Sequence, residues 1–284
     1  MKQTVANSLA MIHSLLPSLS NAEQKVARAV LTAPSDTVYS SVTDLAEAAE
    51  VGETTVIRFC RKLGYGGFQE FKLAIAQDLV SPSQQVYGKI DEKDAIGVIC
   101  QKMTLFNTEA LNDTLSLLNE AELTKAMDAF ITGKRLFFFG VGSSGITAAG
   151  AQYRFMRLGF DAHCASDGHI IAMNCAMMTA SDVVFGISTS GSTKDLVDAL
   201  RIAKENGAFV ICLTSHARSP ITAYANAVLL AASKETPLQG GAFVSKLAQI
   251  HVLDILSTIV SQKQRSSSFE ALNKRAKSVL NKMY

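Results

Sequence analysis

The sequence predicts two domains of different class, an all-α N-terminal domain and an α/β C-terminal domain with a doubly wound parallel sheet. Residues 1–80 show apolar positions at helical spacing and no strand-like alternation. Beyond residue 121, short apolar runs typical of buried strands alternate with helical segments, which is the pattern of a parallel sheet covered by helices. The length of 284 residues also favours two domains.

Composition narrows the class of protein without revealing a partner. The chain is 48% hydrophobic, enough for sizeable cores, and its formal net charge of +2 neither requires nor excludes nucleic acid. Five scattered cysteines without a C-x-x-C pair indicate reduced thiols, and no standard zinc spacing occurs. Because the N-terminus also lacks a signal-peptide pattern, we expect a cytoplasmic protein with no membrane segment, no metal and no cofactor.

Capping signals divide the N-terminal domain, residues 1–80, into separate helices. Ser20 and Glu23 have the spacing of a capping box, which opens an amphipathic helix that Pro34 is expected to end. Ser41 and Asp44 repeat the pattern and open the next helix. Short segments separated by turn signals predict a bundle of short helices rather than one long helix.

The next segments have the lengths of a helix-turn-helix motif. A short helix over 42–49, a tight turn around 50–52 and a second helix over 53–63 follow, and Gly64 ends the second helix. In this motif the second helix is the recognition helix, which lies in the DNA major groove. Its side chains able to contact base edges and phosphates are Glu53, Thr54, Thr55, Arg58, Arg61 and Lys62. An ordinary bundle with a charged face remains an alternative, because acidic residues slightly outnumber basic ones here.

The recognition helix and the residues after it read ETTVIRFCRKLGYGGFQEFK. This stretch resembles the hallmark of the RpiR-type bacterial transcriptional regulators, in which a T-V-x-R-F-x-R-x-L-G core precedes a G-F and F-K continuation. The resemblance implies operator DNA as a partner and adds Lys72 to the expected DNA contacts. One departure is Gly52, where the family commonly has a Ser cap; Gly is a tolerable N-cap, so the helix is still expected.

Residues 81–120 are predicted to be a linker followed by a connecting helix. The segment SPSQQ, residues 81–85, is the least structured point of the chain. Apolar residues then recur at helical spacing between Ala95 and Leu118. We expect this helix to pack on the second domain or on a partner chain.

The C-terminal domain, residues 121–284, is predicted to contain five parallel strands joined by helices. A helix near 219–225 precedes the last strand, and a long helix begins at about residue 241. The predicted strands cover residues 135–139, 161–164, 182–187, 208–213 and 226–230.

Two of these strands end in loops built from Gly, Ser and Thr. Such a loop, placed between a strand and a helix, directs backbone N–H groups and hydroxyls at one point, where the helix N-terminus adds positive potential. Ligands of parallel sheets bind at the carboxyl ends of strands, where both loops fall. The residues expected to bind a phosphate are Gly142, Ser143, Ser144, Ser188, Ser190, Gly191 and Thr193.

Two other interpretations of these loops stay open at this point. Gly140, Gly142 and Gly145 also spell the dinucleotide fingerprint G-x-G-x-x-G, although the second hydroxyl-rich loop has no counterpart in that fingerprint. Alternatively, both loops are tight turns in which Ser or Thr caps the following helix. A helix cap needs one hydroxyl, whereas these loops carry two and three in the positions named above.

The resemblance to RpiR-type regulators extends through nearly the whole chain. Those proteins join the DNA-binding domain to a flavodoxin-like sugar isomerase (SIS) domain, whose two phosphate-binding loops resemble the loops described here. The resemblance implies a phosphorylated sugar or sugar acid as effector, with His169 and Glu235 near the sugar, and Lys246 stands where the family often has Arg.

The function implied is that of a transcriptional regulator, by default a repressor of carbohydrate metabolism genes, acting as a homodimer or homotetramer and not as an enzyme. A phosphosugar aldose-ketose isomerase remains the alternative. In that case Glu235 or His169 would act as the base.

Overall fold

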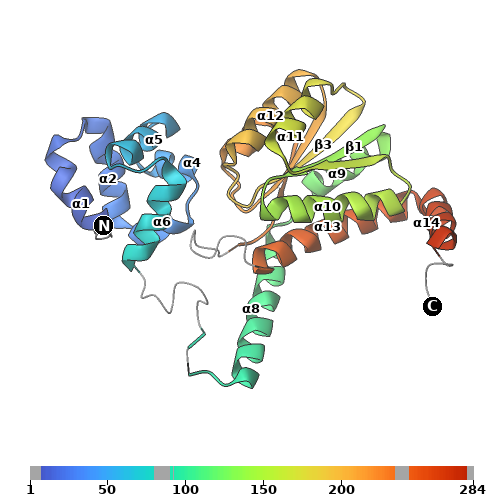
Figure 1. The fold of residues 1–284 in the computed structure, drawn as a ribbon, viewed down its shortest axis with the longest axis horizontal. Coiled ribbons are helices and arrows are strands. Elements are labelled where there is room, and N and C mark those ends of the chain that lie inside the picture. Colours follow the sequence, from blue (N-terminus) through green and yellow to red (C-terminus); the bar gives the residue numbers. More distant parts are fainter. Residues whose placement is uncertain (1–7, 80–89, 92, 234–242, 280–284) are drawn as a thin grey trace. The chain divides into compact units, whose positions relative to one another are not determined.

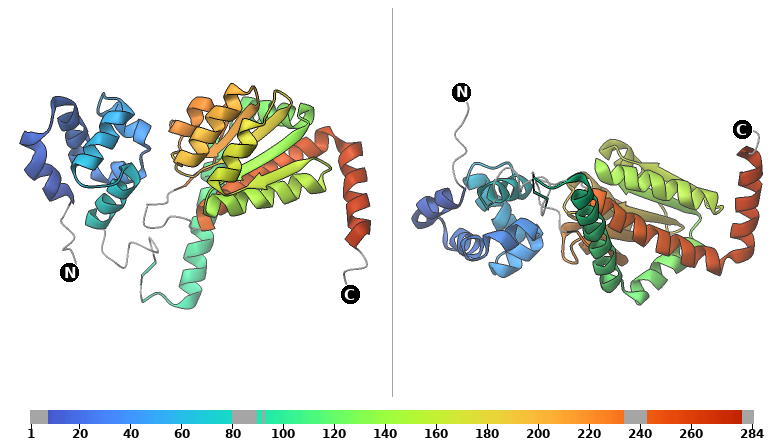
Figure 2. Two further views of the ribbon diagram at one scale, coloured as in Figure 1. Left: turned by 45° about the horizontal axis from the view of Figure 1, so that its top comes forward. Right: turned by 90° about the horizontal axis from the view of Figure 1, so that it is seen from below.

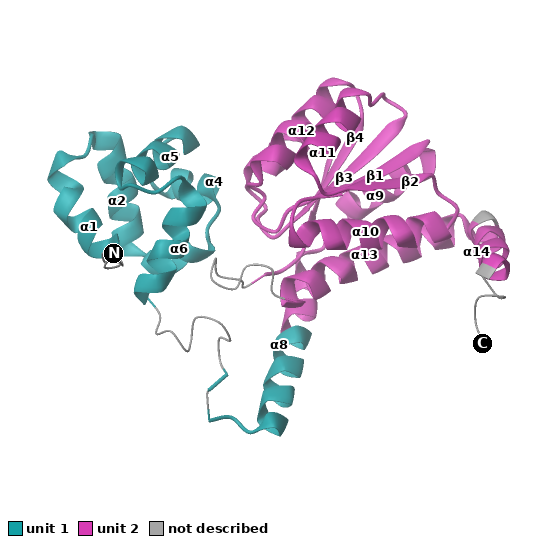
Figure 3. Cartoon of the chain, viewed as in Figure 1, with its two compact units in different colours: residues 1–108, 234–242 teal, residues 109–233, 243–284 magenta. Residues whose placement is uncertain are grey.

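The structure is a computed structural model that describes residues 8–79, 90–91, 93–233 and 243–279. Glu235, an expected sugar contact, lies outside the described residues. The chain divides into two compact units (Figure 3), the first comprising Met1–Thr108 with Lys234–Ala242 and the second comprising the rest. The division falls within helix α8, and the domain limits expected from the sequence remain a prediction.

Unit 1 is a bundle of short helices, as expected (Figure 1). Both capping boxes are confirmed, since Ser20 and Ser41 each accept a hydrogen bond from the backbone three residues on. Pro34, however, begins a further short helix, because a missing N–H costs nothing at the first helical position. The elements of this bundle are α1 (Ser8–Leu15), η1 (Leu16–Ser18), α2 (Asn21–Thr32), α3 (Pro34–Tyr39), α4 (Val42–Ala48), α5 (Glu53–Lys62) and α6 (Phe68–Leu79).

Helices α4 and α5 form the expected helix-turn-helix. Leu45 of α4 and Val56 and Phe59 of α5 are buried in the unit 1 core, so the apolar face of α5 is fixed against the bundle. Gly64 ends the helix with φ +92°, a conformation that glycine adopts without strain. The opposite face of α5 therefore remains on the surface.

Unit 2 contains a five-stranded parallel sheet of order β2-β1-β3-β4-β5. Alternate side chains of the strands face two separate cores: α9, α10 and α13 cover one face, and α11 and α12 cover the other. The strands are β1 (Arg135–Gly140), β2 (Ala162–Ala165), β3 (Asp182–Ile187), β4 (Phe209–Thr214) and β5 (Ala227–Leu230). The helices are α9 (Glu120–Thr132), α10 (Ser143–Arg157), α11 (Gly168–Ala176), α12 (Lys194–Glu205) and α13 (Phe243–Lys263).

The strand order creates a switch point between β1 and β3. From β1 the chain moves outward to β2 and then returns to β3 on the other side of β1, so the two connections leave the sheet in opposite directions. A crevice forms at the carboxyl ends of such strands. Both Ser/Thr loops follow these two strands, which places them at this crevice.

Two elements differ in detail from the prediction. The segment before β5 is a 3-10 helix, η2 (Pro220–Tyr224), and the expected long C-terminal helix is interrupted after α13 and continues as α14 (Arg265–Val279). The connecting helix is confirmed as α8 (Ile96–Leu117), of which Thr114 is the one buried residue.

Helix α13 is the one helix among the described residues that is long and apolar enough to cross a membrane by length and composition. It packs instead against the sheet. Ala248, Val252, Leu256 and Val260 lie one or two turns apart along it and are all fully buried in the core that β1 and β3 also line. Figures 1 and 2 show α13 running beside α10 along one face of the sheet.

Candidate functional site

The first loop requires glycine at three positions, each for a different reason. Gly142 has φ +61°, which other residues rarely adopt. A Cβ on Gly140 would lie 2.6 Å from the Ser144 carbonyl oxygen, and one on Gly145 would lie 2.6 Å from the Ser166 Cβ. The glycines thus allow the start of α10 to approach β1 and the loop after β2.

Helix α10 begins without a side-chain cap. Its N-cap is Gly142, which carries no side chain, so Ser143 and Ser144 occupy the first helical turn and are not caps. Helix α12 begins at Thr193, whose hydroxyl also makes no capping hydrogen bond. The interpretation of the loop hydroxyls as ordinary helix caps is therefore wrong, and both helix N-termini leave N–H groups for another partner.

The second loop is ordered by hydrogen bonds among its own hydroxyls. Ser188 Oγ lies 3.0 Å from Thr193 Oγ1, which closes the loop across five residues. Ser190 Oγ accepts a hydrogen bond from Ser192 N at 3.3 Å. Gly191 has φ +63° and lies so close to Ser219 that a Cβ there would collide with it. These hydrogen bonds fix the positions of the loop hydroxyls.

Lys246, from the first turn of α13, joins the two loops. Its Nζ donates to Ser144 Oγ of the first loop at 3.3 Å and to Thr189 Oγ1 of the second loop at 3.2 Å. It also donates to Gln249 Oε1 at 3.1 Å, and Gln249 Nε2 donates to Thr189 Oγ1 at 3.0 Å. The structure therefore brings together the two expected loops and adds an ammonium group to them. Cations, hydroxyls and helix N-termini are the groups that bind a phosphate.

Neither Thr189 nor Gln249 is among the residues predicted from the sequence, and Lys246 stands out only because the family often has Arg at its position. Thr189 lies between two expected residues, so the run of three hydroxyls was a usable signal. Gln249 is fully buried within an otherwise apolar stretch of α13, and such a residue needs a polar partner. Its partner is 60 positions away along the chain, which local pattern does not reveal.

The loop after β4 adds one further hydroxyl. Ser215 follows Thr214, and its backbone N–H donates to Thr189 O at 3.1 Å, so it lies against the second loop. Its Oγ is buried and has no hydrogen-bond partner among the described residues. Buried hydroxyls in proteins are normally hydrogen-bonded, so Ser215 is a further candidate to contact a ligand of the second loop.

His169, the expected sugar contact that the structure describes, is not joined to the loops by a hydrogen bond or ion pair. His169 is exposed in the first turn of α11, and the part of the chain that the structure describes gives its ring no hydrogen bond or ion pair. The neighbouring Asp167 caps α11 by accepting from His169 N and Ile170 N, so its role is local. No group of three or more His, Cys, Asp or Glu is placed to bind a metal within the described ranges.

Some of the side chains expected to contact DNA are exposed, and others form hydrogen bonds or ion pairs within unit 1. Thr54, Arg58 and Arg61 are exposed on α5, and Thr55 is partly exposed. Glu53 accepts a hydrogen bond from Thr43 of α4, which ties the two helices of the motif together. Helix α5 itself begins at Gly52 without a side-chain cap. The exposed face thus combines hydroxyls, two arginines and an uncapped helix N-terminus.

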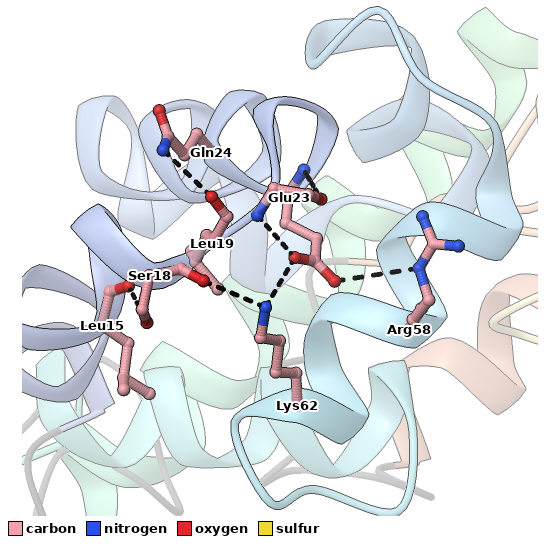
Figure 4. A network of polar contacts seen from close by, with 8 residues as sticks. Leu15, Ser18, Leu19, Glu23, Gln24, Arg58 and Lys62 are labelled. Atoms are coloured by element: carbon pink, nitrogen blue, oxygen red, sulfur yellow. Dashed lines mark hydrogen bonds and ion pairs between the residues drawn. The ribbon is translucent and has the colours of Figure 1, made fainter.

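Two expected lysines are engaged with other groups of unit 1, Lys62 with a side chain that is 42% exposed and Lys72 with a buried one. Lys62 Nζ donates to Ser18 O at 3.3 Å and to Glu23 Oε2 at 3.0 Å (Figure 4). Lys72 is only 5% exposed, and its Nζ donates to Ser40 O at 2.7 Å. Burial lowers the pKa of Lys72 to about 8, an effect that the negative charge of Asp44 partly opposes. The ammonium of Lys72 is therefore not on the surface, and we leave it out of the proposed DNA contacts.

Comparison with known proteins identifies both units. Residues 6–82 match the helix-turn-helix domain of the rpiR family, and residues 129–259 match the SIS domain. An uncharacterised HTH-type transcriptional regulator of Caldanaerobacter subterraneus subsp. tengcongensis is 37% identical over 256 residues, covering 90% of this chain and 91% of that protein. The chain belongs to the RpiR family of transcriptional regulators. HexR of Escherichia coli is 34% identical to this RpiR-family chain, and the similarity covers 96% of this chain and 94% of HexR.

Solved structures share the fold of this chain. The structure of the Vibrio vulnificus NanR protein complexed with ManNAc-6P is similar with a TM-score of 0.88 and 30% sequence identity, covering 98% of this chain and 99% of that chain. The sugar isomerase domain of an RpiR transcription factor from Sphaerobacter thermophilus has the same fold as part of this chain, with a TM-score of 0.58 at 22% identity and 63% coverage of this chain. The family and the two-part fold class expected from the sequence are confirmed.

Proposed function

We propose that this RpiR-family regulator represses carbohydrate metabolism genes and that a phosphorylated sugar or sugar acid, bound at the two loops of unit 2, controls its affinity for operator DNA. The observation that carries the proposal is the position of Lys246, whose ammonium group contacts Ser144 of one loop and Thr189 of the other. A phosphate at this point would meet an ammonium, several hydroxyls and the N-termini of α10 and α12.

The phosphate-binding residues in this proposal are those expected from the sequence, together with Thr189 and Lys246. They are Gly142, Ser143, Ser144, Ser188, Ser190, Gly191 and Thr193 from the two loops. His169 and Glu235 are proposed to contact the sugar. The structure of the NanR protein, which is similar to 98% of this chain, contains ManNAc-6P. This similarity supports a phosphosugar effector.

Control of DNA binding requires that the effector prefer one arrangement of the protein over another. A ligand shifts an equilibrium only by the difference in its affinity for the two states. Two-fold dimers present their recognition helices to half-sites about 34–36 Å apart, so a modest change in the spacing of two helices is enough to weaken operator binding. We therefore propose that the effector favours an arrangement whose α5 helices do not match the operator.

We propose that the protein acts in the cytoplasm as a homodimer or homotetramer. Two adjacent helices of unit 2 expose apolar side chains: Ile146 of α10 is 77% exposed and Ile250 of α13 is 51% exposed. Large apolar side chains exposed on neighbouring helices are the observation that supports a subunit interface here. Light scattering coupled to size-exclusion chromatography tests this point, and a monomeric mass at micromolar concentration would contradict it.

The proposal is tested by combining DNA binding with an effector screen. The full-length protein selects its operator from a random-sequence DNA pool, and fluorescence anisotropy then measures operator affinity with and without ManNAc-6P, glucose 6-phosphate, 6-phosphogluconate and inorganic phosphate. At least one organic phosphate should weaken operator binding, and the same compound should raise the melting temperature because it binds the native state. No effect of any sugar phosphate on DNA affinity would contradict the proposal.

The same compounds distinguish a regulator from a phosphosugar isomerase. Each sugar phosphate is incubated with the protein, and its aldose and ketose forms are quantified by NMR. We expect no interconversion, since the curated relatives with a helix-turn-helix domain are named transcriptional regulators. Conversion that is lost on His169→Ala would instead favour the enzyme.

A further inference from the structure

A buried carboxylate in unit 1 contacts two cations of the helix expected to bind DNA. The Glu23 side chain of α2 is 6% exposed. Its Oε2 lies 3.0 Å from Lys62 Nζ, and its Oε1 lies 3.8 Å from Arg58 Nε (Figure 4). Ser20 N also donates to Oε2 at 2.9 Å. The Ser20 N–H and then the Lys62 ammonium lower the pKa of Glu23 to about 2, so the group is a carboxylate at neutral pH.

The two cations are held in different ways. Lys62 donates to Glu23 and also to the Ser18 carbonyl oxygen, so its ammonium is engaged within the protein. Arg58 faces Glu23 with its Nε, and the 3.8 Å ion pair to Oε1 is longer than a hydrogen bond, while the Arg58 side chain is 62% exposed. Figure 4 shows its two terminal nitrogens directed away from Glu23. Because a guanidinium carries five donors in a planar fork, an arginine held at Nε still presents its Nη groups.

We propose that Glu23 is a positioning residue for operator recognition, which holds Arg58 at Nε so that both Nη groups are presented to a base edge in the major groove. Paired Nη donors match the two acceptors of guanine in that groove. Holding the side chain in advance reduces the conformational entropy lost when it binds DNA. The inference rests on the proposed function, in which α5 contacts the operator.

Lysine should not be able to replace arginine at position 58. A lysine there would have a single ammonium, which could lie near Glu23 or near a base but could not present a fork while held by Glu23. Arg58→Lys keeps the charge and the exposed position. It should therefore keep binding to random DNA, which depends on charge, and lose preference for the operator.

The test is a double-mutant cycle on the full-length protein with Glu23→Gln, Arg58→Ala and the double variant. Anisotropy titrations measure affinity for the selected operator and for random DNA of the same length. Glu23→Gln should reduce the operator-to-random preference by about tenfold, as expected for part of one bidentate base contact. In the Arg58→Ala background the same substitution should cause no further loss, because its effect acts through Arg58.

A matched control separates this role from charge and from stability. Asp36→Asn removes one negative charge from α3 of the same unit, and within the described residues the Asp36 side chain makes no ion pair. It should leave the operator-to-random preference within twofold of wild type. Urea unfolding of each variant shows whether the DNA-binding measurements are made on folded protein. If Glu23→Gln does not fold, Arg58→Lys in the otherwise unchanged chain carries the test.

Two results would overturn the inference. One is a loss of preference on Glu23→Gln that is equally large with and without Arg58. The other is Arg58→Lys retaining the operator preference of the wild type. Failure of the proposed function looks different: Arg61, which has no ion pair among the described residues, is exposed on α5 independently of Glu23. If neither Arg61→Ala nor Arg58→Ala weakens operator binding, α5 is not the DNA-contacting helix.

Discussion

The recognition helix of unit 1 and the paired loops of unit 2 share one feature and differ in another. Helices α5, α10 and α12 all begin without a side-chain cap. Helices α2, α9 and α11 begin instead with a capping side chain, which is Ser20, Asn119 and Asp167 respectively, whereas the short helix α3, for which no ligand is proposed, also begins without one. A side-chain cap satisfies N–H groups that an uncapped helix leaves for an anion. Both proposed binding regions thus keep helix N-termini available for phosphate.

The difference lies in how each region holds its cations. In unit 1 a buried carboxylate, Glu23, forms ion pairs with Lys62 and Arg58, so two cationic side chains of α5 face a negative charge. In unit 2 Lys246 is positioned by hydroxyl and amide oxygens of Ser144, Thr189 and Gln249. The first arrangement suits a rigid surface that meets an extended polyanion. The second suits a small site in which one phosphate is enclosed by many short hydrogen bonds.

The largest effect is expected for Lys246→Met, which removes the ammonium that contacts both loops. Hydrogen bonds to charged groups contribute about 1.5–3 kcal/mol, so effector affinity should fall about 10- to 100-fold. Isothermal titration with the sugar phosphate found in the screen measures the change. Lys263→Met, at the exposed far end of the same helix, is the control and should leave affinity unchanged. Equal effects of the two variants would remove Lys246 from the site.

A slightly smaller effect is expected for Arg61→Ala on operator binding. Arg61 is exposed on α5, and a base or phosphate contact by such a side chain contributes about 1–3 kcal/mol. Anisotropy titrations at several salt concentrations measure both the affinity and the number of phosphate contacts. Arg201→Ala, an exposed arginine of α12 in unit 2, serves as the control. If Arg61→Ala leaves operator affinity unchanged, this face of α5 does not contact the DNA.

The prediction for Lys72 concerns stability and not DNA. Its pKa is about 8 in the native protein against 10.5 unperturbed, so between these pH values the unfolded state binds more protons and native stability rises with pH. Lys72→Met should abolish this rise and leave DNA affinity at neutral pH unchanged. Cys60, whose pKa burial raises to about 12, is present in both proteins and cancels in the difference.

Urea unfolding curves of wild type and Lys72→Met, recorded below pH 8 and near pH 10.5, give the comparison. Identical pH dependence of the two proteins would show that Lys72 is solvated in solution. Operator affinity reduced as much as by Arg61→Ala would return Lys72 to the DNA-contacting residues.

Sequence predicted most of the fold because its signals are local. The capping boxes at Ser20 and Ser41 span three residues, and each strand is a short apolar run bounded by turn residues. Prediction was incomplete where a residue has two roles: Pro34 follows the end of α2, as expected, but the short helix α3 was not predicted. A proline can end one helix and can also start another, and Pro34 is the first residue of α3.

The candidate site was predictable only in part, because only some of its signals are local in sequence. The Gly, Ser and Thr content of the two loops identifies them in the sequence, and the strand order brings them together. Lys246 contacts the loops across 57 and 102 positions of sequence, a relation that arises only when α13 packs on the sheet. Conversely, a basic side chain near a recognition helix was expected to face DNA, but burial against Ser40 places the Lys72 ammonium inside.

The most direct test of the account is operator binding by the double variant Ser188→Ala with Ser190→Ala, measured with and without the effector. The account predicts operator affinity within about twofold of wild type without effector, because both hydroxyls lie in unit 2, and loss of the effector response, because each contributes hydrogen bonds to the phosphate. A double variant whose operator binding still weakens on adding the sugar phosphate as in wild type would contradict the assignment of these loops as the effector site.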